Sequence, residues 1–355
     1  MTSRENKIRA YRRQKPEWIP ISVGITPMCW ETNDPRELEA LVRAHPVLFP
    51  HQEPIMARNH PLPGYQQAGK SYEDGWGCIW VSAHDGMTGT VTKHPAADWD
   101  AFDSLRIPDP DRSDGMRVED EVADWEKMRR IIQSNKENGI FTSARLEHGH
   151  TLLRLEYLRG YQNLIYDMAD ADPRLDQLIE RVKGFSLERV RRMVRTEPDM
   201  IHYPEDLGSQ TQPLISPDLF RRYIKPVYRE LVAPAREKGI LIHMHSDGYI
   251  LDLLEDLMDV GMDVINMQDL VNGLDNIRRF AGTRIAVDLD IDRQSITVSG
   301  SPKDIDDHIR EAVMKLGSPE GGLSMTWQVW PPTPVRNMAA VMEAMEKYST
   351  YYRSH

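Results

Sequence analysis

Short apolar runs rich in β-branched residues alternate along the chain with longer stretches in which apolar residues recur at i, i+3, i+4 and i+7. The short runs predict β-strands, and the longer stretches predict amphipathic helices. The predicted strands are Trp18–Thr26, Gly139–Glu147, Met200–Glu205, Ile240–Ser246, Val264–Gln268, Arg284–Asp290 and Gly322–Val329. The clearest predicted helices are Ile250–Met258, Pro217–Lys238, Pro302–Lys315 and Pro334–Tyr348.

The order of these elements predicts the fold class. From Gly139 onward a strand and a helix repeat about every 20 to 40 residues, which is typical of a parallel sheet with helical crossovers. No GxGxxG sequence follows a predicted strand, so a doubly wound nucleotide-binding fold is not favoured. We therefore predict a single (β/α)8 barrel domain spanning residues 1–355. Residues 45–111, rich in proline, glycine, histidine and tryptophan, are expected to form a lid-like excursion from it, with a β-like run near Gly75–Val81.

Composition and charge narrow the function classes. The chain has 44 basic and 55 acidic side chains, a formal net charge of −11, so nucleic-acid binding is not expected. The longest stretch without a charged residue, Gly321–Val335, contains three prolines, whereas a membrane span needs about 20 apolar residues, so no membrane partner is expected. Two cysteines and an amino terminus without an apolar signal region predict a cytoplasmic protein.

Acids and imidazoles gather at the ends of the predicted strands. In a barrel these ends meet at one mouth, where active sites lie. Such acids are seldom tolerated in buried strands unless they are paired, hydrogen-bonded or bound to a metal. The alternative is that an acid just past a strand caps the next helix, which could apply to Asp247 and Asp269. The ring consists of Glu147, His148, His150, Glu205, Asp206, His243, His245, Asp247, Gln268, Asp269, Asp288, Asp290 and Gln328, the last flanked by Trp327 and Trp330.

The sharpest local feature is the sequence ILIHMHSDGYI at 240–250. His243 and His245 face the same side of the predicted strand, and Asp247 follows, so this segment could hold a metal or a proton donor. A structural hydrogen-bonded role is favoured for His243, which lies deeper in the strand, and a functional role is favoured for His245. Between Tyr203 and Gln210, two acids run into a glycine- and amide-bearing loop, which could shape a pocket or only lead into a helix.

At these stretches the chain resembles the uroporphyrinogen decarboxylase superfamily and, within it, the cobalamin-dependent methyltransferase-like branch. The likeness extends over nearly the whole chain. The motifs that carry it, in chain order, are RENKIRAYRRQKPEWIPISVG, EDGWGCIW, KHPAADWDAF, YLRGYQNLIYDMADADP, EDLGSQTQPLISPDLFRRYIKPVYRELV, HSDGYILDLLEDLMDVGMDVIN and PPTPVRNMAAVMEAMEKY.

The resemblance implies a barrel with a deep mouth, but this sequence departs from the family at two places. In the coenzyme-linked methyltransferases zinc is held by a His-x-Cys pair and a later cysteine. The pair falls on His245 and Asp247 here, and the region 324–328 expected to supply the later cysteine has none. After the first strand, GITPMCWETND lacks the arginines that clamp porphyrinogen carboxylates. The HSDG sequence resembles demethylating components that pass a methyl group from an ether or amine to a corrinoid protein.

We therefore expect a methyltransferase that moves a methyl group from a small O- or N-methylated substrate to a corrinoid protein partner, which carries the cobalamin. The protein could form a homodimer. The first alternative is a cofactor-independent decarboxylase or lyase acting on a small organic acid, and a second is a non-enzymatic binding protein. The expected catalytic residues are His245, Asp247, Glu205 and Asp206, with zinc on His245, Asp247 and Glu205. The expected substrate contacts are Glu147, Gln210, Gln268, Trp327 and Trp330. The alternative for the two tryptophans is that they only form the wall of the barrel mouth and do not contact substrate.

Overall fold

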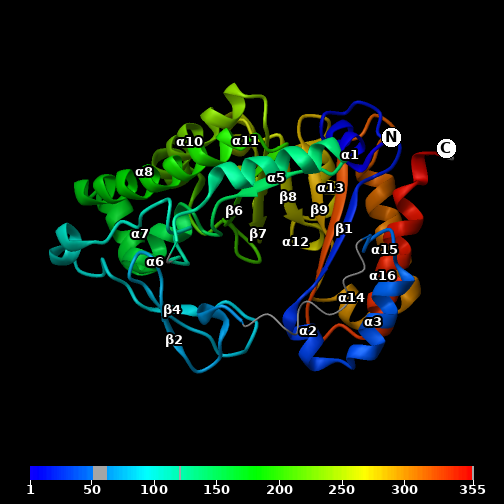
Figure 1. Ribbon diagram of the computed structural model, residues 1–355, viewed down its shortest axis with the longest axis horizontal. Coiled ribbons are helices and arrows are strands. Elements are labelled where there is room, and N and C mark those ends of the chain that lie inside the picture. The colour runs from blue at the N-terminus through cyan, green and yellow to red at the C-terminus, as the bar shows by residue number, and fades with distance from the viewer. Residues whose placement is uncertain (51–61, 120, 354–355) are drawn as a thin grey trace.

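A curled parallel sheet surrounded by helices forms the centre of the molecule (Figure 1). The computed structural model describes residues 1–50, 62–119 and 121–353. Seven strands follow the order β1-β10-β9-β8-β7-β6-β5, and every neighbouring pair is parallel. They are β1 (Ile21–Ile25), β5 (Ser143–Arg145), β6 (Met200–Asp206), β7 (Leu241–Asp247), β8 (Val264–Gln268), β9 (Ala286–Asp290) and β10 (Leu323–Val329).

The barrel-type α/β fold predicted from the sequence is confirmed, and all seven predicted strands are present. The described residues supply seven strands to this sheet, where an eight-stranded barrel was expected. The edge strands β1 and β5 do not pair with each other, so the barrel is not closed between them. The physical reason is that the chain between them leaves the barrel wall. Its short strands β2 (Ser71–Glu73), β3 (Ile79–Val81) and β4 (Thr90–Lys93) pair with one another in a separate antiparallel sheet.

Helices cover the outside of the curled sheet, with α8, α10 and α11 on one side and α13, α15 and α16 on the other (Figure 1). Helix α15 illustrates how the sequence specifies them. Ser301 and Asp304 form a capping box, Pro302 occupies the first turn, and apolar residues such as Ile305 and Ile309 are buried. None of the described helices is long and apolar enough to cross a bilayer.

The α-helices of the described residues are α1 (Ser3–Tyr11), α2 (Pro27–Thr32), α3 (Pro35–Ala44), α5 (Trp125–Glu137), α6 (Leu152–Arg159), α7 (Tyr161–Asp170), α8 (Pro173–Arg195), α9 (Pro217–Leu219), α10 (Lys225–Glu237), α11 (Leu254–Val260), α12 (Asp269–Asn272), α13 (Leu274–Ala281), α14 (Ile296–Ser299), α15 (Pro302–Leu316) and α16 (Val335–Ser349). Single turns of 3₁₀-helix lie at η1 (Gly64–Gln66), η4 (Leu251–Leu253) and η5 (Tyr351–Arg353), a longer one at η2 (Trp99–Ser104), and a π-helical segment, η3 (Phe220–Ile224), joins α9 to α10.

Helix α1 lies at the amino ends of the strands and closes that end of the barrel. Its Tyr11 packs with the first residues of four strands in an apolar layer, against which Phe141 also packs. Beyond this layer the interior becomes polar, because inward positions of the strands carry histidine, asparagine, aspartate and serine. The four strand residues of the layer are Met200, Leu241, Val264 and Ala286.

A buried carboxylate helps to fix the excursion to the barrel. Asp74 accepts hydrogen bonds from Trp76 N (2.9 Å), Cys78 N (2.9 Å) and Trp80 Nε1 (3.0 Å). Its Oδ2 atom also lies 2.7 Å from Arg154 NH1 on helix α6, and both side chains are almost fully buried. The segment 45–111 was expected to form a lid, and its residues 51–61 lie outside the described part of the chain. The remainder places β2–β4 beside the carboxyl ends of β6 and β7 (Figure 1).

Candidate functional site

Two imidazoles and a carboxylate meet at the carboxyl ends of strands β5, β6 and β7. Asp206 is the last residue of β6, and His245 lies two residues before the end of β7. His148 follows β5, the neighbour of β6 in the sheet. The Nε2 atoms of His148 and His245 lie 3.3 and 3.6 Å from Asp206 Oδ1. All three residues belong to the ring expected from the sequence, and we call them the mouth cluster.

The donor atoms of the mouth cluster fit a metal ion. One atom from each residue lies within 4.8 Å of the other two. A tetrahedral zinc ion with ligands at about 2.0–2.1 Å has edges of about 3.3 Å between ligand atoms, close to the two distances above. Two imidazole nitrogens with one carboxylate oxygen are also a donor set of catalytic zinc sites. Asp247 and Glu205, which were expected as ligands, lie outside this triangle.

The electrostatics of the mouth cluster couple Asp206 to His245. Burial raises the pKa of Asp206, but hydrogen bonds with His148 and His245 outweigh it and hold that pKa well below its ordinary value. Burial lowers the pKa of His245, whereas Asp206 and Asp247 raise it to about 9. The Nδ1–H of His245 donates to Asn266 Oδ1, which orients the ring. Without a metal, His245 is therefore a positioned proton donor at neutral pH.

Asp247 is held by an arginine that the sequence analysis missed. The Arg293 guanidinium contacts the Asp247 carboxylate and lies 3.3 Å from Asp290 Oδ2. Burial raises the pKa of Asp290 to about 7, although Arg293 opposes the shift. The Asp247 carboxylate accepts no backbone N–H among the described residues, so nothing there supports a helix-capping role. The position of Arg293, three residues beyond strand β9, was the signal that could have identified it.

A cavity of about 860 Å³ lies beside the mouth cluster. Glu147 lines it, and burial together with Asp114 raises the pKa of Glu147 to about 7, although nearby arginines oppose the shift. Arg145 is exposed to the cavity and has no hydrogen-bond or ion-pair partner in the described part of the chain. An arginine inside a predicted strand was a usable signal for it. Other lining residues are Tyr65, Trp80, Tyr157, Tyr161, Arg117 and Arg189.

Glu205 lies apart from the mouth cluster, although it precedes Asp206. Its side chain is fully buried and accepts hydrogen bonds from Thr151 N (2.8 Å), Leu152 N (2.8 Å) and Tyr228 Oη (2.7 Å). The first two donors belong to the start of helix α6, where a carboxylate satisfies unpaired N–H groups. This placement assigns Glu205 to holding α6 in position.

The four remaining expected substrate contacts do not line the cavity. Gln268 is buried, and its Oε1 accepts a hydrogen bond from Gly248 N at 2.9 Å. Gln210 is exposed on the loop after β6. Trp327 is fully buried and donates its Nε1–H to the carbonyl of Asp292 at 3.1 Å, while Trp330 is half-buried after β10. The cavity wall instead takes its aromatic rings from the excursion and from α6 and α7.

Comparison with known proteins identifies a family and solved structures with a similar fold. The uroporphyrinogen decarboxylase family model matches residues 79–348. A methyltransferase from Methanosarcina mazei superposes with a TM-score of 0.62 over 98% of this chain and 99% of that chain, at 17% identity. No curated protein sequence matches.

Two other solved structures are more distant. A GH113 β-1,4-mannanase has a TM-score of 0.44 over 96% of this chain and 100% of that chain, at 13% identity. A putative vitamin-B12-independent methionine synthase from Listeria monocytogenes has a TM-score of 0.38 over 64% of this chain and 86% of that chain, at 11% identity. Similarity at this level carries no argument about function, whereas the Methanosarcina likeness supports the barrel-type fold.

Proposed function

The chain belongs to the uroporphyrinogen decarboxylase family, and from this premise we propose that it is a demethylating methyltransferase. In this proposal it moves a methyl group from a small O- or N-methylated substrate to the corrinoid of a partner protein. The single observation that carries the proposal is the mouth cluster, which places a proton donor and a metal-compatible donor set beside one cavity. The fold similarity to a methyltransferase agrees with it. Corrinoid transfer would take place in a reducing cytoplasm, consistent with free Cys29 and Cys78.

Demethylation requires a group that neutralises the charge developing on the leaving atom. When the methyl group passes from an ether oxygen to the acceptor, the electron pair of the broken C–O bond stays on the oxygen, which must be neutralised. Without a bound metal, His245 holds a proton at Nε2, next to Asp206, which stabilises the charged imidazole; with zinc bound, that nitrogen would be a ligand and the leaving atom would be neutralised through the metal instead. Glu147, whose pKa lies near neutrality, can restore that proton from the cavity side.

Zinc is the metal that the mouth cluster fits, with His148, Asp206 and His245 as its ligands. When bound there it would act as a Lewis acid on the substrate oxygen or nitrogen. His245 must lose its proton to ligate, so metal affinity should fall in acid. Because the cluster lacks a thiolate, we expect zinc to be removed by mild chelation and restored by added zinc.

The cavity also indicates what the substrate carries. Arg145 faces it without a hydrogen-bond or ion-pair partner among the described residues, and such a guanidinium in a partly enclosed cavity favours an anionic group on the ligand. Tyr157 and Trp80 pack edge to face, with 4.7 Å between their ring centroids, and give the cavity an aromatic wall. A methylated aromatic acid combines both features.

The test is an anaerobic assay of the purified protein with cob(I)alamin and a panel of methoxybenzoates and N-methylated amino acids. We expect methylcobalamin and the demethylated product in equal amounts, and zinc in the protein by elemental analysis. The variant His245→Ala should lose both the methyl transfer and the zinc. The exposed His84, which lies outside the cluster, supplies the control variant His84→Ala, which should retain both.

Two results would argue against the proposal. Full activity after exhaustive chelation, with no metal in the protein, would leave His245 as an acid acting without zinc. Release of carbon dioxide or another cleavage product from a small organic acid without cobalamin, and no methyl transfer, would replace the proposal with the decarboxylase or lyase alternative. In that reaction Asp290 or Glu147, whose pKa values lie near neutrality, would protonate the carbanion.

A further inference from the structure

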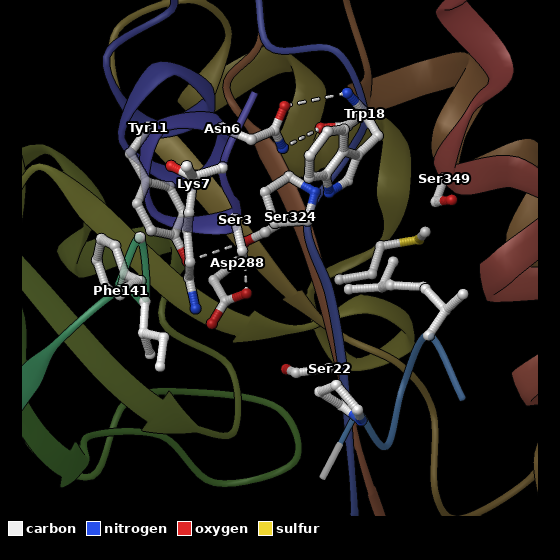
Figure 2. A pocket seen from close by; sticks show the side chains of 18 of the residues that line it. Ser3, Asn6, Lys7, Tyr11, Trp18, Ser22, Phe141, Asp288, Ser324 and Ser349 are labelled. Atoms are coloured by element: carbon white, nitrogen blue, oxygen red, sulfur yellow. Dashed lines mark hydrogen bonds between the residues drawn. The ribbon is translucent and has the colours of Figure 1, made fainter. Parts of the chain in front are cut away.

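A second cavity, of about 980 Å³, opens between the two unpaired edges of the barrel. It is lined by Ser22 at the start of β1, by Ser143 in β5 and by residues of helix α1, and it shares no lining residue with the mouth cavity. Figure 2 shows Lys7 and Asp288 pointing into its centre, with Tyr11, Phe141 and Ser324 around them. The site lies toward the amino ends of the strands, away from the mouth cluster.

A hydrogen-bonded relay of three residues leads to this cavity. Asp288 accepts from Ser324 Oγ at 2.5 Å and lies 3.0 Å from His243 Nε2, so each of its oxygens has one hydrogen-bond partner. The Nδ1 atoms of His243 and His202 lie 3.0 Å apart. Burial raises the pKa of Asp288, but the hydrogen bonds from His243 and Ser324 and the nearby charges of His243 and Lys7 together outweigh it and hold the pKa at about 2, so the carboxylate is ionised.

The ionised carboxylate sets the tautomers of both histidines. It can only accept, so His243 carries a proton on Nε2. Burial, His243 and Lys7 hold the pKa of His202 well below its ordinary value, so this ring is neutral. When the Nδ1–H of His202 donates to His243 Nδ1, the Nε2 of His202 keeps a free lone pair. That atom has no protein partner among the described residues, and His202 lines the cavity.

Lys7 is the second unsatisfied group in the cavity. Its Nζ lies 4.9 Å from the centroid of the Phe141 ring and 5.8 Å from that of Tyr11. No acceptor in the described part of the chain hydrogen bonds to it. Burial lowers the pKa of Lys7, and Asp288 partly opposes the shift. The Lys7 amine and the His202 Nε2 atom thus line one cavity without a hydrogen-bond partner among the described residues, so both are available to a ligand.

We propose that this cavity is a second binding site, for a small organic acid that carries a hydroxyl group. Its carboxylate accepts hydrogen bonds from Lys7 Nζ, its hydroxyl donates to His202 Nε2, and its apolar part packs against Phe141 and Trp18, which also line the cavity. Each of these two functional groups pairs with one protein group that lines the cavity without a hydrogen-bond partner among the described residues. His202 and Asp206 are four residues apart on strand β6, about 13 Å, so a small ligand here does not reach the mouth cluster.

The test is calorimetric titration of the full chain with a panel of hydroxy acids, namely lactate, 3-hydroxybutyrate, malate and mandelate. Propionate, which lacks the hydroxyl of lactate, and propane-1,2-diol, which lacks its carboxylate, are the matched probes. We expect at least one hydroxy acid to bind one site per chain, its deoxy analogue to bind at least about tenfold more weakly, and the diol not to bind. Lys7→Met should abolish binding and His202→Asn should weaken it at least about tenfold. The exposed Lys15, outside the cavity, supplies the control Lys15→Met, which should bind normally.

Absence of binding across the panel, or binding that persists in Lys7→Met, would overturn the proposal. A second measurement protects the test against variants that fail to fold. The ¹⁵N chemical shifts of the unliganded wild-type protein should show His202 with a proton on Nδ1 and none on Nε2, and added ligand should shift the Nε2 signal. A proton on Nε2 in the unliganded protein would contradict the relay on which the site depends.

Discussion

The two cavities of the barrel use the same strands in opposite ways. At the mouth, acids and bases pair across strands, as Asp206 does with His148 and His245 and Asp247 does with Arg293. Toward the amino ends, strands β6, β7 and β9 supply His202, His243 and Asp288, which form a relay, and Lys7 has no hydrogen-bond partner in the described part of the chain.

The difference follows from solvent access. The side chains of Asp206 and His245 are 31% and 24% exposed, whereas that of His243 is 4% exposed. Partly solvated groups can hold charge and exchange protons or a metal, while enclosed ones must be hydrogen-bonded within the protein or remain neutral. We therefore expect changes at the mouth to affect turnover, and changes in the relay to affect the free energy of unfolding.

The largest effect is expected for Asp206→Asn. Loss of the carboxylate removes the partner that stabilises protonated His245 and one of the three expected zinc ligands, so turnover should fall at least about 100-fold. The amide oxygen can still accept from Asp247 N, now at 3.0 Å from Asp206 Oδ1, so the thermal midpoint should move by only a few degrees. Steady-state kinetics and thermal unfolding measure the two effects. Asp218→Asn, at an exposed position, is the control.

A fall in stability as large as the fall in activity would contradict this division. It would mean that Asp206 mainly holds the ends of β6 and β7 together, and that the mouth cluster is structural.

The next largest effect is expected for Asp288→Asn, measured as stability against pH. The folded-state pKa of Asp288, about 2, lies below its ordinary value, so its ionised form stabilises the folded state above about pH 4. This stability is lost as the pH falls from about 4 to 2. Urea unfolding at neutral pH should show a loss on the order of 2 kcal/mol in the variant, and its stability should then depend less on pH in the acid range. Parallel acid profiles for the two proteins would show that Asp288 is not ionised in the relay.

A smaller effect is expected for Arg145→Gln at the mouth cavity. If the substrate carries an anion, losing the guanidinium should raise KM about tenfold for a methoxybenzoate and leave KM unchanged for the corresponding methoxybenzyl alcohol. The partly exposed Arg129, on the outer helix α5, gives the control Arg129→Gln. Equal changes in KM for both substrates would assign Arg145 to shaping the cavity rather than recognising charge.

Periodicity located the barrel strands because each is an apolar, β-branched run. The prediction for β8, Val264–Gln268, matches the structure at both ends. For β5 the predicted run, Gly139–Glu147, was longer than the observed Ser143–Arg145, because an edge strand pairs on one side only. The excursion was predicted as turns and short strands with a β-like run near Gly75–Val81, where β3 lies, but strands of three or four residues carry too little pattern to reveal the antiparallel sheet.

The candidate site was predictable as a ring but not as particular contacts. Position at a strand end brought His148, Asp206 and His245 onto one list, yet the same rule included Glu205, which turns toward helix α6. Strand periodicity predicts how far along the barrel axis a residue lies. The direction of the side chain at the last residue of a strand depends on tertiary packing, which the sequence pattern does not reveal. Arg293 was not predicted because it lies beyond the end of its strand, in a turn, where strand periodicity does not indicate the direction of a side chain.

The smallest effect is expected for Ser324→Ala, which tests whether the relay acts as a unit. The Ser324 hydroxyl donates to Asp288 and lies 3.3 Å from the Tyr11 hydroxyl, which can donate to it in turn. Its removal leaves Asp288 bonded to His243, so the free energy of unfolding should fall by only about 1 kcal/mol. Combined with Asp288→Asn, the effect should be less than additive, because the serine has then lost its ionised acceptor. Ser299→Ala, at an exposed site, is the control. Strict additivity in this double-mutant cycle would show that Ser324 and Asp288 stabilise the barrel independently, and that the polar interior is a set of separate contacts.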